Sequence, residues 1–184
     1  MSRQYTVLRQ ATVGSQFAAL DEALKEIRRT QPHLAETLQR VDWPAVRQQV
    51  ARETIAQVAK KHGVAAKSFS TWRTSGGVQP RGAFAGIIEM RGTDIALFVA
   101  DDKIELAWQE SHYARDERLA TAVDAAGRAA MPTVVKELQR ELAQAYRERA
   151  LAASLRIVAA GQQVRREVRP DGGVVLRVTV KGGA

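Results

Sequence analysis

The sequence predicts an α+β protein in which helices cover one face of an antiparallel sheet. Three observations lead to this class. Residues 84–109 form three short strand-like runs, a long amphipathic stretch follows Pro132, and a second strand–turn–strand pattern closes the chain at 163–180. With 184 residues, 45% of them hydrophobic, the chain is long enough to bury a substantial core.

The N-terminal region predicts one strand and one helix. Residues 5–13 alternate loosely between apolar and polar side chains, as a strand does. The period then changes to that of a helix, which we expect over 16–29. Its apolar face consists of Phe17, Leu20, Leu24 and Ile27. Pro32 ends this helix because the residue before a proline is disfavoured in the helical conformation.

The next segment is expected to be helical. A short helix is predicted over 34–41, and another begins at Asp42-Trp43-Pro44, where the proline suits the first helical turn. The clearest loop of the chain, 74–82, follows. We therefore expect residues 31–82 to form an inserted helical subdomain. The α+β domain would then consist of residues 1–30 and 83–184.

Residues 55–73 predict a helix-turn-helix. Gly63 suits the turn because glycine tolerates a positive φ, and the second helix would be free to enter a DNA major groove. The small core between the two helices is expected to contain Val58, Val64, Phe69 and Trp72. The candidate nucleic-acid contacts are Lys60, Lys61, Lys67, Ser70, Thr71 and Arg73. The alternative is a plain helical hairpin on the sheet, with its basic residues solvated.

The second half of the chain predicts a β-meander, a long helix and a hairpin. The meander strands cover 84–90, 93–100 and 103–109, with tight turns at Arg91-Gly92 and Asp101-Asp102. Helix is expected from Arg115 onward, divided at Met131-Pro132, because proline suits the first position of a new helix. Its apolar stripe consists of Val135, Leu138, Leu142, Tyr146 and Leu155. The terminal hairpin turns at 169–173.

The charge balance favours a polyanionic partner. The chain has 28 Lys and Arg against 20 Asp and Glu, a formal net charge of +8, and such a surplus raises association with nucleic acid. An acidic protein is the alternative partner. Aromatic side chains that offer base stacking are Trp72, Trp108, Tyr113 and Phe84. Of these, Trp72 and Trp108 are expected in the core.

Several enzyme classes lack their sequence signatures. The chain has no cysteine, which excludes disulfides and thiolate chemistry. It contains no phosphate-binding P-loop, nucleophile elbow or dinucleotide fingerprint. No apolar run approaches the roughly 20 residues that span a bilayer. We therefore expect a cytoplasmic, non-enzymatic protein without a cofactor or a bound metal.

A cluster of acidic residues leaves a metal-dependent nuclease open as a weaker alternative function. Glu89, Asp94, Asp101, Asp102 and Glu105 lie on the predicted meander beside Lys103, an arrangement loosely typical of magnesium-dependent nucleases. However, Asp94 and Asp101 would lie at opposite ends of one strand. Asp101-Asp102 is also a favourable turn sequence without any metal.

Parts of the chain resemble known families. Residues 5–29, the run Thr93-Asp94-Ile95-Ala96-Leu97-Phe98-Val99 and the closing 164–180 hairpin resemble a family of uncharacterised cyanobacterial and chloroplast proteins. The resemblance covers about two thirds of the chain, 5–29 and 84–180. Similar proteins are encoded beside MoxR-type AAA+ ATPases, which implies an accessory or adaptor role. The segment 55–72 separately looks like the helix-turn-helix of bacterial repressors and transposases.

Together these observations lead to one functional expectation and its rivals. We expect a nucleic-acid-binding accessory protein that uses the segment 55–73 and engages a partner or its own copy. The alternative is an adaptor of an AAA+ ATPase, and the weaker alternative is a magnesium-dependent nuclease.

Overall fold

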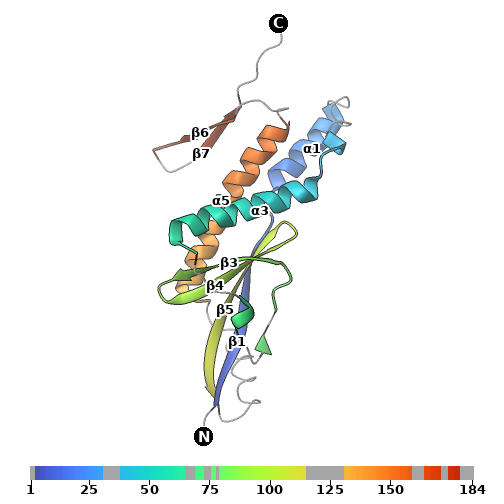
Figure 1. Ribbon diagram of the computed structural model, residues 1–184. Helices are drawn as coiled ribbons and strands as arrows, with labels where there is room; N and C mark the ends of the chain where they lie inside the picture. Colours follow the sequence, from blue (N-terminus) through green and yellow to red (C-terminus); the bar gives the residue numbers. More distant parts are fainter. Residues whose placement is uncertain are drawn as a thin grey trace.

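The computed structural model describes residues 3–30, 38–64, 69–72, 76–77, 79–114, 131–158, 164–170 and 174–178. It confirms the α+β class. In the described part of the chain, long helices gather on one face of an elongated antiparallel sheet (Figure 1). The predicted helix over 34–41 lies mostly outside the described residues, and so does the predicted helical stretch at 115–130.

The main sheet has the strand order β2-β1-β5-β4-β3. Its strands are β1 (Arg3–Val13), β2 (Gly76–Gly77), β3 (Ala83–Met90), β4 (Thr93–Ala100) and β5 (Lys103–Ala114). The predicted meander is confirmed, because β3, β4 and β5 are consecutive antiparallel neighbours. Arg91 and Asp101 adopt positive φ values of 50° and 53° in the two tight turns. β1 pairs antiparallel with β5 and parallel with the short β2.

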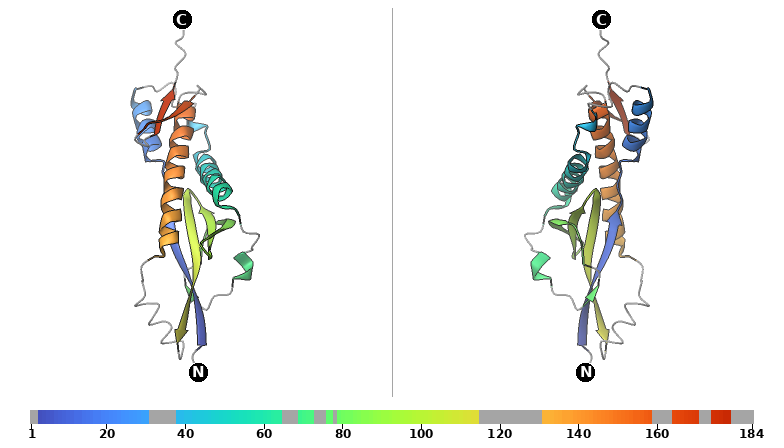
Figure 2. Two further views of the ribbon diagram at one scale, coloured as in Figure 1. Left: turned by 90° about the vertical axis from the view of Figure 1, so that its left-hand side faces the viewer. Right: turned by 90° about the vertical axis from the view of Figure 1, so that its right-hand side faces the viewer.

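The long helices are α1 (Ala18–Thr30), α3 (Trp43–His62) and α5 (Thr133–Val158). α3 begins where the sequence predicted it, since the Asp42 side chain accepts a hydrogen bond from the Ala45 backbone N–H and Pro44 lies in the first turn. α5 begins directly after Pro132, as expected. It lies between α1 and α3 (Figure 2).

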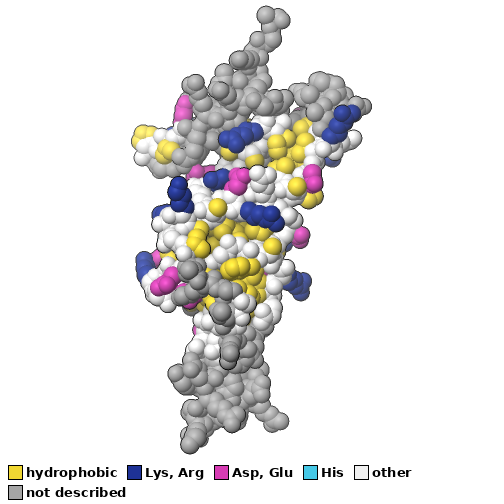
Figure 3. Space-filling model, viewed as in Figure 1, with side chains coloured by type: hydrophobic (Ala, Val, Ile, Leu, Met, Phe, Trp, Pro, Cys, Tyr) yellow, Lys and Arg dark blue, Asp and Glu magenta, His cyan; other side chains and the backbone are white. Residues whose placement is uncertain are grey.

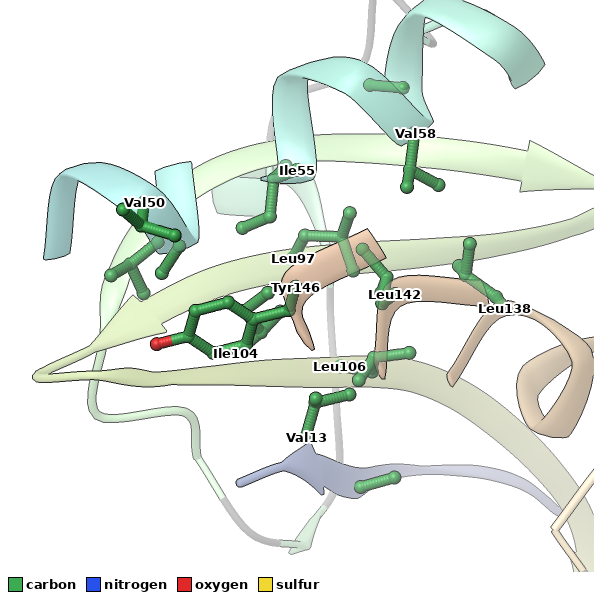
Figure 4. Packing of buried hydrophobic residues seen from close by; sticks show 14 of the residues in the cluster. Val13, Val50, Ile55, Val58, Leu97, Ile104, Leu106, Leu138, Leu142 and Tyr146 are labelled. Carbon is green, nitrogen blue, oxygen red and sulfur yellow. The ribbon is translucent and has the colours of Figure 1, made fainter. Parts of the chain in front are cut away.

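The core lies between the sheet and these helices. Alternation along β4 directs Ile95, Leu97 and Val99 to the helical side, whereas Ala96 and Phe98 belong to a second cluster on the opposite face. The predicted stripe of α5 is fully buried from Val135 to Tyr146. Figure 4 shows its leucines between the β4–β5 pair and the apolar side chains of α3. Residues of α3, which lie within the range 31–82, thus share one core with the sheet and α5.

The closing hairpin is also confirmed, with β6 (Val164–Val168) antiparallel to β7 (Val174–Val178). It forms a separate two-stranded sheet and does not extend the meander. Trp108 is buried and belongs to the same core cluster as the apolar stripe of α5. None of the helices described here combines the length and the apolar composition needed to cross a membrane.

One polar contact ties α5 to the β4–β5 turn. The Tyr146 hydroxyl donates a hydrogen bond to the Asp102 backbone carbonyl. Burial raises the pKa of Tyr146, the nearby Asp102 charge raises it further, and Arg47 partly opposes both. Arg47 in turn holds Asp21 of α1 at 2.6 Å and lies over the Phe17 ring. The folded protein therefore favours the neutral phenol.

The surroundings of Tyr146 predict how the stability of a Tyr146→Phe variant depends on pH. At about pH 8, we expect it to be less stable than the unchanged protein by about 0.5–1.5 kcal/mol, because the Asp102 carbonyl loses its donor. A raised folded-state pKa contributes stability that is complete below the unfolded pKa of about 10 and is lost as the pH rises further. The deficit of the variant should therefore shrink between about pH 9 and pH 11. Urea unfolding across that range measures it, and a constant deficit would contradict this account.

Candidate nucleic-acid interface

The structure corrects the predicted helix-turn-helix. Its four expected core residues do not form one cluster. Val58 lies in the core between α3 and the sheet, whereas Phe69 and Trp72 pack against the cluster on the opposite face of the sheet. Val64 is 60% exposed. The core that would hold a recognition helix against the first helix is therefore absent from the described residues, and this part of the prediction is wrong.

The reason lies in how the chain leaves α3. Gly63 has a φ of 82° and its backbone N–H bonds to the Ala59 carbonyl, so it ends the helix, as a glycine at this position does. Val64 then forms an antiparallel bridge to Ile88 of β3. Beyond it, the described part of the predicted second helix is the 3₁₀ helix η1 (Phe69–Thr71). Contact with the sheet thus replaces contact between two helices.

Of the six predicted contact residues, the structure describes the side chains of Lys60, Lys61 and Ser70. Lys60 is exposed on α3, but the neighbouring Lys61 points to α5, where its Nζ lies 2.6 Å from Glu141. Ser70 is exposed in η1. The backbone of Thr71 also belongs to η1, but its side chain lies outside the described structure. Lys67 and Arg73 lie outside the described residues altogether.

Lys60 lines a groove between α3 and the edge strand β3. Its volume is about 540 Å³. We call it the α3–β3 groove, and it is lined by Arg52, Ile55, Ala56, Ala59, Lys60, Val64, Ala83, Phe84, Ala85 and Val99. Figure 3 shows an apolar area over β3 and β4, with Lys and Arg side chains above it along α3.

The helix side of this groove follows from simple spacing. Arg52, Ala56 and Lys60 are four residues apart and therefore share one face of α3. All three are exposed, while Ile55 and Ala59 beside them are buried. The small Ala56 side chain leaves space between the two cations. One face of α3 thus presents two positive charges about two helical turns apart.

The strand side of the groove depends on an irregularity in β3. Phe84 pairs with Phe98 and Gly86 with Leu97, so Ala85 is an extra residue in the ladder. Such a bulge bends a strand and turns the adjacent side chains. Directly before β3, the backbone N–H groups of Arg81 and Gly82 both donate to one carboxylate oxygen of Glu105, at 2.9 and 3.1 Å. These bonds fix the start of β3 against the sheet.

The charge of the groove is unbalanced. Among the described residues, neither Arg52 nor Lys60 has an ion pair, and no acidic residue lines the groove. Other cations nearby are paired: Arg149 with Glu53 at 3.0 Å, and Lys61 with Glu141. Pairs of this kind neutralise the side of α3 that faces α5. On α3, the cations without an ion pair to a described residue are therefore those on the groove side.

Glu141 is the centre of the neutralised side. Burial opposes its ionisation, but hydrogen bonds from Lys61 and His62 outweigh that effect and hold the pKa of Glu141 below its usual value. The carboxylate therefore stays charged near neutral pH and keeps Lys61 engaged. Lys60 and Lys61 are adjacent in sequence, yet only Lys60 faces the groove.

Phe84 is the exposed aromatic residue of the groove, with 46% of its surface accessible. Its ring is held in place by other aromatic rings. Phe69 of η1 stacks on it with centroids 6.2 Å apart and an interplanar angle of 25°, and Phe98 of β4 meets it edge-on at 5.6 Å. Aromatic contacts of this kind have preferred geometries. The Phe84 ring therefore belongs with the aromatic side chains on the sheet face opposite α3, although the residue itself borders the groove.

The acidic residues of the meander are arranged differently from a metal centre. Glu89 and Asp94 are cross-strand partners at one end of the β3–β4 pair, and Asp101 lies in the turn at the other end of β4, as the sequence predicted. Asp102 pairs with Arg47 at 3.5 Å. Within the described residues, no three histidine or acidic side chains gather in a group that would hold a metal ion.

Comparisons with known proteins add no further assignment. The chain matches no protein-family model, no curated protein and no solved structure.

Proposed function

We propose that the protein is a non-enzymatic accessory protein that binds nucleic acid through the α3–β3 groove. The observation that supports this most directly is that Arg52 and Lys60 lie on one face of α3 and have no ion pair with any described residue. Phosphate oxygens are the natural partners of such groups, and phosphate contacts supply most of the non-specific affinity for nucleic acid. The chain's net charge of +8 also favours association with nucleic acid.

This proposal retains Lys60 from the predicted contact set but changes the surface. The helix-turn-helix prediction placed the reading residues on a second helix after Gly63. In the proposal, the cationic face belongs to α3 itself, and the neighbouring apolar surface comes from β3. Binding through such a face requires no insertion of a recognition helix into the major groove.

The test compares two variants with the same loss of charge. Arg52→Gln with Lys60→Gln removes both groove cations. Lys136→Gln with Arg140→Gln removes two exposed cations four residues apart on α5, which have no ion pair in the described part of the chain and do not line the groove. We expect the groove variant to bind a fluorescent oligonucleotide at least about tenfold more weakly at roughly 0.1 M salt, because each lost phosphate contact removes the gain from counterion release.

The salt dependence provides a second readout. For the unchanged protein, affinity should fall steeply with rising salt, and the slope of log affinity against log salt should decrease by about 1 for each groove cation removed. The α5 variant should remain close to the unchanged protein in both measurements. Equal affinities and slopes for the two variants would reject the α3–β3 groove as the binding surface. Thermal unfolding checks that both variants remain folded.

A further inference from the structure

We infer that Glu141 is an autoinhibitory residue of the proposed nucleic-acid surface, because it withholds Lys61 from a position beside Lys60. This inference rests on the proposed function and adds a control on its strength. Glu141 belongs to α5 and does not line the α3–β3 groove, yet both of its carboxylate oxygens contact the end of α3. Its Oε1 lies 2.6 Å from the Lys61 Nζ, and its Oε2 lies 2.7 Å from the His62 Nε2.

A carboxylate and a phosphate compete for the same lysine, because both accept charge-assisted hydrogen bonds from an ammonium group. The Lys61 side chain is 68% exposed, so a phosphate can approach it, but its ion pair with Glu141 directs the ammonium toward α5. Burial opposes the ionisation of Glu141, but the hydrogen bonds from Lys61 and His62 outweigh that effect and lower its pKa. Glu141 is therefore charged near neutral pH and competes as a full anion.

A released Lys61 reaches the cationic face of α3. It directly follows Lys60, and successive residues of a helix are turned by only about 100° around its axis. A lysine carries a compact charge on a flexible four-carbon stem, so its ammonium can move from the α5 side of the helix toward Lys60. The surface then consists of Arg52 and a pair of lysines about 12 Å further along α3.

The position of α3 does not depend on Glu141 alone. Arg149 of α5 donates a hydrogen bond from its Nε to the Gln57 side chain at 2.6 Å, and its guanidinium lies 3.0 Å from Glu53. Apolar side chains of both helices also share one core. Glu141→Gln therefore removes the charge at the end of α3 and leaves these other ties between the two helices intact.

The test compares Glu141→Gln with Glu137→Gln, which removes the same charge one helical turn earlier on α5. Glu137 pairs with Arg91 at 3.2 Å, and neither of these two residues lines the groove. The probe is the fluorescent oligonucleotide used for the groove variants, at roughly 0.1 M salt and about pH 8. We expect Glu141→Gln to bind it about three- to tenfold more tightly, with a salt slope steeper by about 1. Glu137→Gln should remain within about twofold of the unchanged protein, since salt screens a distant charge.

Lys61→Gln separates the release of the lysine from the loss of a negative charge. Alone, it should change the affinity by less than about twofold, because Glu141 already engages this lysine. Combined with Glu141→Gln, it should abolish the whole gain in affinity and in salt slope. A gain that persists without Lys61 would reflect net charge only and overturn the inference. A loss from Lys61→Gln alone as large as that from Lys60→Gln would overturn it too, because Lys61 would then already bind phosphate.

The outcomes separate this inference from the proposed function. If removal of Arg52 and Lys60 weakens binding while Glu141→Gln and Glu137→Gln bind equally, Glu141 withholds nothing, the inference fails and the proposed function stands. If neither the unchanged protein nor any variant binds the oligonucleotide, both fail. Thermal unfolding of each variant confirms that the compared proteins are folded.

Discussion

Replacing Leu142 with alanine is expected to lower the free energy of unfolding by about 2–5 kcal/mol. Leu142 is fully buried on α5, in the core that α5, α3 and the sheet share. The variant loses the transfer free energy of the side chain and leaves a cavity in a layer where the neighbours on three elements limit collapse (Figure 4). Urea or thermal unfolding measures the loss directly.

Leu151 on the same helix provides the matched control. It is 36% exposed, so Leu151→Ala removes the same atoms from a position that water already reaches. We expect a change within about 0.5 kcal/mol. A similar loss of stability in both variants would mean that the burial of Leu142 is not the cause of its loss, because alanine is the better helix former at both positions.

The second large effect is expected at Gly82. A Cβ atom at this position would lie 2.5 Å from the carbonyl carbon of Val99 and 2.6 Å from its oxygen. These are backbone atoms of β4, so relief requires that the start of β3 move away from its neighbour. Gly82→Ala should therefore cost about 1–3 kcal/mol, in the range of overpacked sites. The shift would also disturb the two hydrogen bonds to Glu105.

Gly14 is the control for this substitution. A Cβ atom there meets nothing within 4 Å, and its φ lies outside the positive range. Gly14→Ala should be neutral or stabilise the protein by about 0.4–1 kcal/mol, because alanine restricts the unfolded chain. Equal losses at Gly14 and Gly82 would show that steric contact with β4 is not the cause.

Much of the fold could be predicted from local pattern. The β3–β4–β5 meander and the β6–β7 hairpin are confirmed because strand alternation and turn residues lie close together in sequence. The length of β5 could not be predicted in this way. It extends to Ala114, where the ladder pairs that residue with Arg3 more than a hundred positions earlier. Only the pairing of distant segments sets that boundary.

The predicted core of the helix-turn-helix was wrong for a related reason. The apolar spacing from Val58 to Trp72 is compatible with a small local core, and the sequence contains no signal for the competing contacts. In the structure, Val58 is buried in the common core of α3 and the sheet, whereas Phe69 and Trp72 pack on the opposite sheet face. Each of these residues packs on a face of the main sheet. These tertiary contacts replace the expected contacts between two short helices, because tertiary packing overrides local preference.

The candidate site was only partly predictable. Lys60 was among the predicted contacts, and it lines the α3–β3 groove. Arg52 was missed, although its spacing of eight residues from Lys60 places both on one helical face. That signal becomes visible once residues 43–62 are treated as one helix rather than as the beginning of a two-helix unit.

The bulge at Ala85 and the bridge from Val64 to Ile88 have a further consequence for solubility. β3 is the outermost strand on its side of the sheet, and a regular strand in that place offers a row of free amide and carbonyl groups to other chains. Here the bulge breaks that row in the first half of β3, and Val64 occupies part of the second half. Two molecules therefore cannot fuse their sheets continuously along this margin, which protects a strand rich in alanine and isoleucine from fibrillar self-association.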